Sequence, residues 1–152
     1  MGIWERLDLD PAVHRMVALV GGGGKSSTMY AMAKQAADSG RKAVVTTTTH
    51  ILPHPGLPLA GDLAQLAALL KKHRVVTLGA YDSRGKLTGA GDPGACLELA
   101  DVVLIEADGA KLRPLKAPAD HEPVIPPSCH AVIASAGLDS LGKPVEEICH
   151  RP

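Results

Sequence analysis

A run of four glycines separates an apolar segment from a helical pattern, and this feature constrains the fold more than any other. The apolar segment Met16–Val20 is typical of a buried strand, and the helical pattern runs from Lys25 to Ser39, just before Gly40. Between them the sequence at 21–27 is Gly-Gly-Gly-Gly-Lys-Ser-Ser, here named the glycine loop. A strand, a glycine-rich turn and a helix in this order bring backbone N–H groups and a helix N-terminus to one point, where phosphate binds well.

The spacing of the glycine loop matches a short form of the phosphate-binding motif. The strict pattern GxxxxGK[ST] requires glycine where the chain has Leu19, but GxxGK[ST] fits and resembles the loop of the Mur-type ligases. In such loops lysine reaches the outer phosphates and the serine hydroxyl binds Mg²⁺. We predict that ATP or GTP with Mg²⁺ binds here, the alternative being a flexible turn with an incidental lysine. The predicted nucleotide-binding residues of the loop are Gly21, Gly22, Gly23, Gly24, Lys25, Ser26 and Ser27.

Strand-like and helix-like segments alternate along the rest of the chain. Apolar runs at 43–45, 74–78, 102–105 and 131–134 alternate with helical patterns at 62–70 and 93–99, and a hairpin-like excursion is expected within 79–93. This alternation predicts an α/β fold, a three-layer P-loop NTPase-like parallel sheet with helices on both faces. We expect a single nucleotide-binding domain over 1–152. Because the chain stops where another element should follow, we also expect that a C-terminal part is lacking.

Two carboxylates follow the run Val102–Ile105. In open parallel sheets ligands bind beyond the carboxyl ends of the strands, so Glu106 and Asp108 are expected at the edge that carries the glycine loop. One carboxylate would hold Mg²⁺ while the other orients an attacking water. We assign the metal to Ser26 and Glu106 because Asp108-Gly109 is itself a turn signal, and we predict Lys25, Glu106 and Asp108 as catalytic. The alternative is that one carboxylate only caps the next loop.

Threonines and a histidine end the second expected strand. Hydroxyls at this edge can donate to phosphate, so Thr48 and Thr49 join the predicted nucleotide-binding residues, although threonine also favours β structure in general. For His50, a hydrogen-bonded role in the site and ordinary packing are both open. The pairs Cys129-His130 and Cys149-His150 match no common zinc spacing, and the three cysteines are an odd number without a CxxC pair. We expect buried or free thiols.

Charge and composition exclude several classes of function. Sixteen Lys and Arg balance sixteen Asp and Glu, and the chain has one Trp, two Tyr and no Phe. A basic field or a stacking surface for nucleic acid is therefore not expected. The longest strongly apolar runs are about five residues, far below the roughly 20 that span a bilayer, and residues 1–10 do not form a signal peptide. We expect a cytoplasmic protein that binds neither nucleic acid nor membrane.

A proline-rich segment, residues 109–128, follows the two carboxylates and is here named the signature loop. It holds five prolines and no clear element, and loops of this length are usually functional or disordered. Its charged residues favour a functional loop, whereas a proline-stiffened loop with solvated charges is the alternative. The candidate substrate-binding residues are Lys111, Arg113, Lys116, His121 and Glu122.

Three longer motifs lie in order along the chain: GGGGKSS at 21–27, VTTTTHI at 45–51 and IEADGAKLRPLKAPADHEPVIP at 105–126. Together they resemble the YqeC family, described as accessory proteins of selenium-dependent molybdenum hydroxylases. The resemblance implies a P-loop nucleotide-binding protein that acts in the maturation of these hydroxylases, with a molybdenum hydroxylase or its cofactor as partner. The cations of the signature loop would then bind an anionic group such as phosphate, selenophosphate or the tail of a molybdopterin cofactor.

Three functions are compatible with these patterns. The first is a Mg²⁺-dependent NTPase or nucleotide-using transferase in hydroxylase maturation, with catalysis by positioning and electrostatics. The second is a nucleotide-gated carrier or assembly chaperone without robust intrinsic catalysis. The third, an ATP-dependent ligase, requires a substrate domain for which 152 residues leave no room. No [NT]KxD guanine motif is present, and Asp139 is either a base contact or an ordinary turn aspartate.

Overall fold

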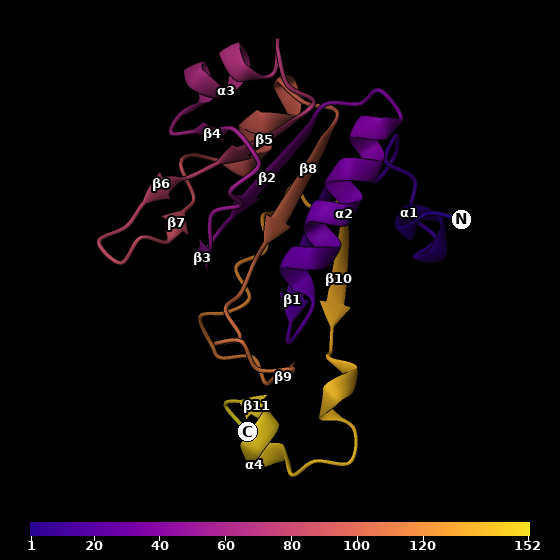
Figure 1. Ribbon diagram of the computed structural model, residues 1–152, viewed down its shortest axis with the longest axis vertical. Helices are drawn as coiled ribbons and strands as arrows, with labels where there is room; N and C mark the ends of the chain where they lie inside the picture. Colours follow the sequence, from indigo (N-terminus) through magenta and orange to yellow (C-terminus); the bar gives the residue numbers. More distant parts are fainter.

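Six parallel strands form the central sheet of the computed structural model, which describes all residues, 1–152. Their order across the sheet is β10-β1-β8-β2-β5-β4 (Figure 1). The three strands at the centre are apolar throughout most of their length and buried, as expected for strands covered on both faces. The predicted parallel α/β sheet is thus confirmed. The strands are β1 (Met16–Gly21), β2 (Ala43–Thr47), β4 (Leu59–Ala60), β5 (Val75–Leu78), β8 (Val102–Glu106) and β10 (Ala131–Ser135).

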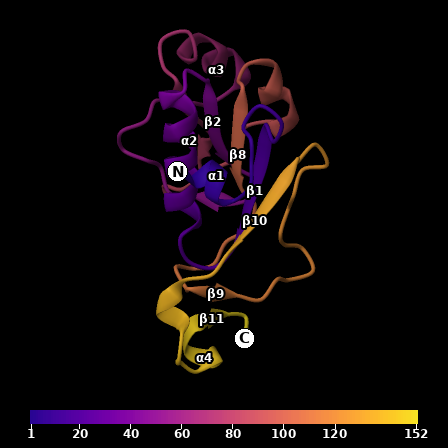
Figure 2. The same ribbon diagram turned by 90° about the vertical axis from the view of Figure 1, so that its right-hand side faces the viewer.

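Helices cover both faces of this sheet and enclose two hydrophobic clusters. On one face α1 (Ile3–Arg6) and α2 (Lys25–Asp38) pack over β1, β8 and β2 (Figure 2). On the other face α3 (Leu63–Leu69) and the 3₁₀ helix η1 (Pro93–Glu98) enclose the second cluster. None of the helices combines the length and the apolar composition that a membrane span requires.

Local sequence signals set the ends of the helices. The Asp62 carboxylate accepts a hydrogen bond from the Gln65 N–H at 2.8 Å and so caps α3. Gly40, with φ of 86°, follows the end of α2. The segment at 93–99, expected as a short helix, is a 3₁₀ helix that begins at Pro93 after the Asp92 cap.

Two smaller sheets complete the fold. The excursion after β5 forms an antiparallel hairpin of β6 (Ala80–Tyr81) and β7 (Leu87–Thr88), and β3 (His50–Ile51) pairs with β7. At the carboxyl ends of the central strands, β9 (Leu115–Lys116) pairs with β11 (Cys149–His150). Together with η2 (Leu138–Ser140) and α4 (Val145–Ile148) they form what we name the small lobe (Figure 1).

Candidate functional site

The glycine loop connects β1 directly to α2. Gly21 and Gly24 have φ angles of 98° and 91°, in the left-handed region where a residue with a side chain is strained. No side chain caps the N-terminus of α2, and the first N–H groups of a helix have no acceptor within the helix. The 14-residue helix therefore presents the positive end of its dipole at this loop.

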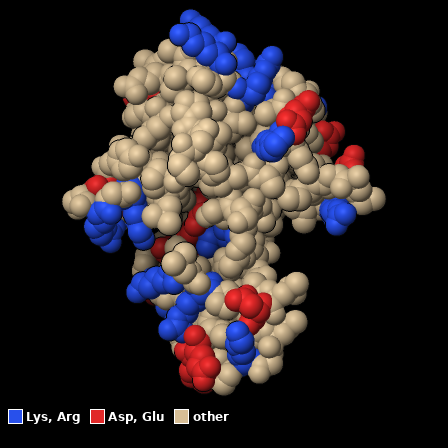
Figure 3. Space-filling model, in the orientation of Figure 1, with Lys and Arg blue, Asp and Glu red and all other residues tan.

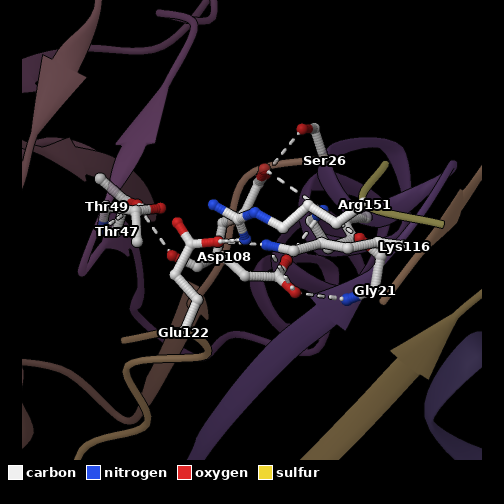
Figure 4. A network of polar contacts seen from close by, with 10 residues as sticks. Gly21, Ser26, Thr47, Thr49, Asp108, Lys116, Glu122 and Arg151 are labelled. Atoms are coloured by element: carbon white, nitrogen blue, oxygen red, sulfur yellow. Dashed lines mark hydrogen bonds and ion pairs between the residues drawn. The ribbon is translucent and has the colours of Figure 1, made fainter. Parts of the chain in front are cut away.

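Strand pairing brings the two carboxylates to the glycine loop. β8 lies beside β1, with Glu106 opposite Leu19 in the register. The Ser26 hydroxyl donates to Glu106 Oε2 at 2.8 Å, and Lys25 Nζ lies 3.0 Å from Asp108 Oδ1. The Gly21 N–H also donates to Asp108 Oδ2 at 2.9 Å (Figure 4). The structure thus brings together the four side chains that the sequence singles out at 25, 26, 106 and 108.

Burial governs the electrostatics of these groups. Lys25, Glu106 and Asp108 are only 4%, 8% and 2% exposed. Burial raises the pKa of Glu106 above its ordinary value, an effect that the Ser26 hydrogen bond and the Lys25 charge oppose and that the Asp108 charge reinforces. Glu106 therefore takes up a proton more readily than an exposed glutamate, and a cation close to it would favour its ionised form.

Two further cations and one carboxylate extend this network. The Lys116 ammonium is buried, lies 3.5 Å from Asp108 Oδ2 and pairs with Glu122, which also accepts from Arg151 Nη1 at 3.1 Å (Figure 4). Burial raises the pKa of Glu122, but the hydrogen bonds from Lys116 and Arg151 outweigh it, and the pKa lies below its ordinary value. The sequence gives no signal for Arg151, which is distant along the chain. Acidic and basic atoms are visible at the narrow part of the molecule above the small lobe (Figure 3).

The other charged residues of the signature loop lie apart from this network. Arg113 donates from Nη1 to the carbonyl oxygens of Glu146, Glu147 and Cys149, at 3.0, 2.8 and 3.1 Å, and so holds the end of α4. Lys111 and His121 are exposed. The structure therefore brings Lys116 and Glu122 into the site and does not bring the three cations of the loop together.

Backbone carbonyl oxygens already accept hydrogen bonds from two N–H groups of the glycine loop. The Gly23 N–H donates to the Pro114 carbonyl at 3.1 Å, and the Gly22 N–H donates to the Ser135 carbonyl at 2.8 Å. The Pro114 carbonyl also accepts from the Gly137 N–H at 2.8 Å. The fit is close, because a Cβ atom on Gly22 would lie 2.0 Å from the Pro114 oxygen. The signature loop is thus closed over the glycine loop, which the sequence does not indicate.

The threonines at the end of β2 hydrogen-bond to the backbone of the segments that form the site. The Thr47 hydroxyl donates to the Glu106 carbonyl at 2.7 Å and accepts the Thr49 N–H at 2.9 Å. The Thr48 hydroxyl donates to the Val124 carbonyl at 2.6 Å and so fastens the signature loop. Thr47, which the sequence did not single out, therefore hydrogen-bonds to the carboxylate strand, whereas the predicted Thr48 and Thr49 make no hydrogen bond to the glycine loop.

Two further candidates lie elsewhere. His50 Nε2 is 3.7 Å from Asp82 Oδ2 in the hairpin, so its polar neighbour is not in the glycine loop. Asp139 lies on η2 and is exposed. The three cysteines are free thiols, as expected, and burial raises the pKa of Cys96 to about 11.

Comparison with known proteins places the chain in a family. The YqeC protein family matches residues 17–152, which include the glycine loop, both carboxylates and the signature loop. The chain belongs to the YqeC family. A relative from Escherichia coli (strain K12), named uncharacterized protein YqeC, is 38% identical over 147 residues. That match covers 90% of this chain and 57% of the relative, so the chain spans little more than half the length of this YqeC protein. No solved structure matches.

The donor set suits a Mg²⁺ ion that is bound mostly by a nucleotide. No group of three or more His, Cys, Asp or Glu side chains is arranged to hold a metal alone. Mg²⁺ commonly takes one or two protein ligands and completes its octahedral shell with phosphate oxygens and water. The Ser26 hydroxyl and the Glu106 carboxylate, whose oxygens lie 2.8 Å apart, are a pair of this kind.

Proposed function

We propose that this protein is a Mg²⁺-dependent nucleotide-binding protein of the P-loop type that uses ATP or GTP, as an NTPase or a nucleotide-using transferase. The observation that carries the proposal is the convergence of an uncapped helix N-terminus, the Lys25 ammonium and the Ser26–Glu106 pair at one sheet edge. The three together supply what a Mg²⁺-bound polyphosphate needs: N–H donors, a cation and oxygen ligands for the metal.

The buried ion network allows Lys25 to change partners without leaving a carboxylate uncompensated. Lys25 now faces Asp108 at 3.0 Å, and it would turn to the phosphates when a nucleotide binds. Asp108 would keep the Gly21 N–H at 2.9 Å and the Lys116 ammonium at 3.5 Å. Since an unpaired buried charge is strongly destabilising, Lys116 acts as the second cation that makes this exchange possible.

The chemistry would rest on positioning and electrostatics. Lys25 and the helix N-terminus would neutralise charge that develops on the transferred phosphoryl group. Ser26 and Glu106 would hold Mg²⁺, which would supply positive charge to stabilise the phosphate oxygens. Asp108, two residues beyond Glu106, is then the carboxylate that remains to orient a water or an acceptor hydroxyl.

A second candidate function is a nucleotide-gated carrier or assembly chaperone. It is favoured by the Pro114 carbonyl, which accepts the hydrogen bond from the Gly23 N–H that a phosphate would need. Nucleotide entry must therefore displace the signature loop, and this displacement couples the nucleotide to a conformational change. In this function hydrolysis is slow or depends on a partner.

The biological setting of the proposal is the maturation of selenium-dependent molybdenum hydroxylases in the cytoplasm. Its support is the resemblance of the three sequence motifs to a family described as accessory proteins of these hydroxylases. The partner would be a molybdenum hydroxylase or its cofactor. The exposed Lys111 and His121 at the surface of the signature loop are the residues available to contact it.

Calorimetric titration with Mg·ATP and Mg·GTP tests the proposal. Lys25→Ala should weaken binding at least about tenfold, because a hydrogen bond to a charged group contributes about 1.5–3 kcal/mol. Lys34→Ala is the matched control, since Lys34 lies on the same helix but is exposed and paired with Asp38. Equal heats from the wild type and Lys25→Ala would refute the assignment.

Turnover assays separate the two candidate functions. Steady hydrolysis by the protein alone, lost in the Glu106→Gln, Asp108→Asn double variant, would favour the enzyme. Hydrolysis that begins only when a hydroxylase apoprotein is added would favour the carrier or chaperone.

A further inference from the structure

A cavity of about 300 Å³ lies beside β5, on the α2 side of the sheet and apart from the glycine loop. Its walls come from the loop at 53–57, from β4 and β5, and from the β6–β7 hairpin. Two of its lining residues, Leu59 and Leu87, belong to the hydrophobic cluster beneath α2 or pack against it. The volume is at the lower end of the range for small-molecule sites, about 300–1,000 Å³.

One buried hydroxyl in this cavity has no partner. Thr77 lines the cavity, is 2% exposed, and its Oγ1 makes no hydrogen bond. Its neighbours Val76 and Leu78 belong to the cluster on the opposite face of the sheet, so Thr77 faces the cavity side. Buried hydroxyls are nearly always satisfied, as Thr46 on the adjacent strand shows by donating to the Leu78 carbonyl at 2.9 Å. The Thr77 hydroxyl is therefore an uncommitted hydrogen-bonding group in the wall of the cavity.

The lining restricts the chemistry of that ligand. It contains no Lys, Arg, Asp or Glu, so a charged group would be buried there without compensation. His54, Tyr81 and two prolines offer flat surfaces. His54 Nδ1 accepts the Gly56 N–H at 3.2 Å, so this imidazole carries its proton on Nε2, where it can donate. A molecule with flat apolar faces, no charge and a polar edge fits these walls.

Tyr30, on α2, packs against the His54 wall of this cavity. The ring centroids of Tyr30 and His54 lie 4.5 Å apart, and the buried Tyr30 hydroxyl has no hydrogen-bond partner. Burial, and then the charge of Glu106, raise the pKa of Tyr30 to about 12, so its hydroxyl stays protonated. In the sheet, β8, which ends at Glu106, lies between β1 and β2, and β5 and β4, which line the cavity, follow beyond β2.

We propose that this cavity binds an uncharged nitrogen heterocycle of the nucleobase type, with Thr77 hydrogen-bonded to its polar edge. The ring belongs either to a second substrate or to the nucleotide itself; both of these roles rest on the proposed function, whereas binding of the free heterocycle does not. Tyr81, 62% exposed on the hairpin, covers one side of the ring.

Binding of free nucleosides tests this inference without involving the glycine loop. Adenosine, guanosine and cytidine are titrated into the wild type, Thr77→Val and the matched control Thr46→Val. We expect at least one nucleoside to bind at millimolar concentration or tighter, Thr77→Val to weaken it about tenfold or more, and Thr46→Val to bind as the wild type does. Thr77→Val removes an unpartnered hydroxyl and keeps the shape, so it should fold; Tyr81→Ala, at an exposed position, is the second variant and should also weaken binding.

A second set of titrations identifies the source of the ring. If Thr77→Val weakens the Mg²⁺ complex of the matching nucleoside triphosphate but not Mg²⁺ tripolyphosphate, the ring is the base of the nucleotide. If both bind unchanged while the nucleoside is lost, the ring belongs to a separate substrate. The inference is overturned if no nucleoside binds the wild type, or if Thr77→Val and Tyr81→Ala bind it as tightly as the wild type. Nucleoside binding that persists in Lys25→Ala, with no triphosphate binding to the wild type, would contradict the proposed function alone.

Discussion

A single methyl group on Gly22 should force the signature loop away from the glycine loop. A Cβ atom there would lie 2.0 Å from the Pro114 oxygen and 2.3 Å from its carbonyl carbon, and backbone atoms of this kind do not yield easily. Withdrawal of Pro114 breaks the hydrogen bonds that its carbonyl accepts from Gly23 and Gly137. At about 0.5–1.5 kcal/mol each, Gly22→Ala should lower the free energy of unfolding by about 1–3 kcal/mol.

The adjacent glycine provides the control. A Cβ atom on Gly23 would meet its nearest neighbour at 3.4 Å, an ordinary contact, and neither glycine has a positive φ. Any gain from reducing the freedom of the unfolded chain is then common to both variants and cancels in their difference.

Urea denaturation measures the stability difference, and trypsin cleavage after the exposed Lys111 measures the opening of the loop. We expect Gly22→Ala to be less stable than Gly23→Ala and to be cut faster. Equal unfolding free energies and equal cleavage rates would refute the closed contact.

Two pH-dependent predictions follow from the carboxylates. Because the pKa of Glu106 is raised, this carboxylate begins to take up a proton while the pH is still above 4.5. The affinity for Mg·ATP, measured by calorimetry, should therefore fall as the pH is lowered toward 4.5. The Glu106→Gln variant should bind weakly, and its affinity should change less with pH. Glu122 has a lowered pKa, so its contribution to stability is present above pH 4.5 and is lost as the pH falls through the folded-state value. Glu122→Gln should therefore destabilise the protein at pH 7 and flatten the acid side of its stability curve, whereas Asp120→Asn, at an exposed position, should leave the curve unchanged.

The parts of the fold that the sequence predicts are those that local physics determines. The apolar runs became strands of the central sheet, Asp62 capped α3, and the spacing of Glu106 and Asp108 placed both carboxylates beside the glycine loop. Each of these depends on residues close together in the chain and on the rule that parallel strands end at one edge.

The missed features depend on contacts between distant segments. α1 is a single turn, and β4, β9 and β11 have two residues each, too short for any periodicity to be visible. Likewise, no local pattern indicates that Pro114 covers Gly22, that Arg113 holds the carbonyls after α4, or that Arg151 joins Glu122. The expected anion site of three loop cations failed to assemble because two of them already have partners within the chain.

The central claim is that phosphate binds at the glycine loop, through the N–H groups of Gly23 and Gly24, and the amide NMR signals of Gly21 to Gly24 test it most directly. On addition of Mg·ATP or Mg·GTP to the ¹⁵N-labelled protein, these signals should shift strongly, together with that of Gly137, which shares the Pro114 carbonyl. Adenosine or guanosine with Mg²⁺ should leave the glycine-loop signals in place. Unchanged signals of Gly21 to Gly24 at saturating Mg·ATP and Mg·GTP would contradict the account.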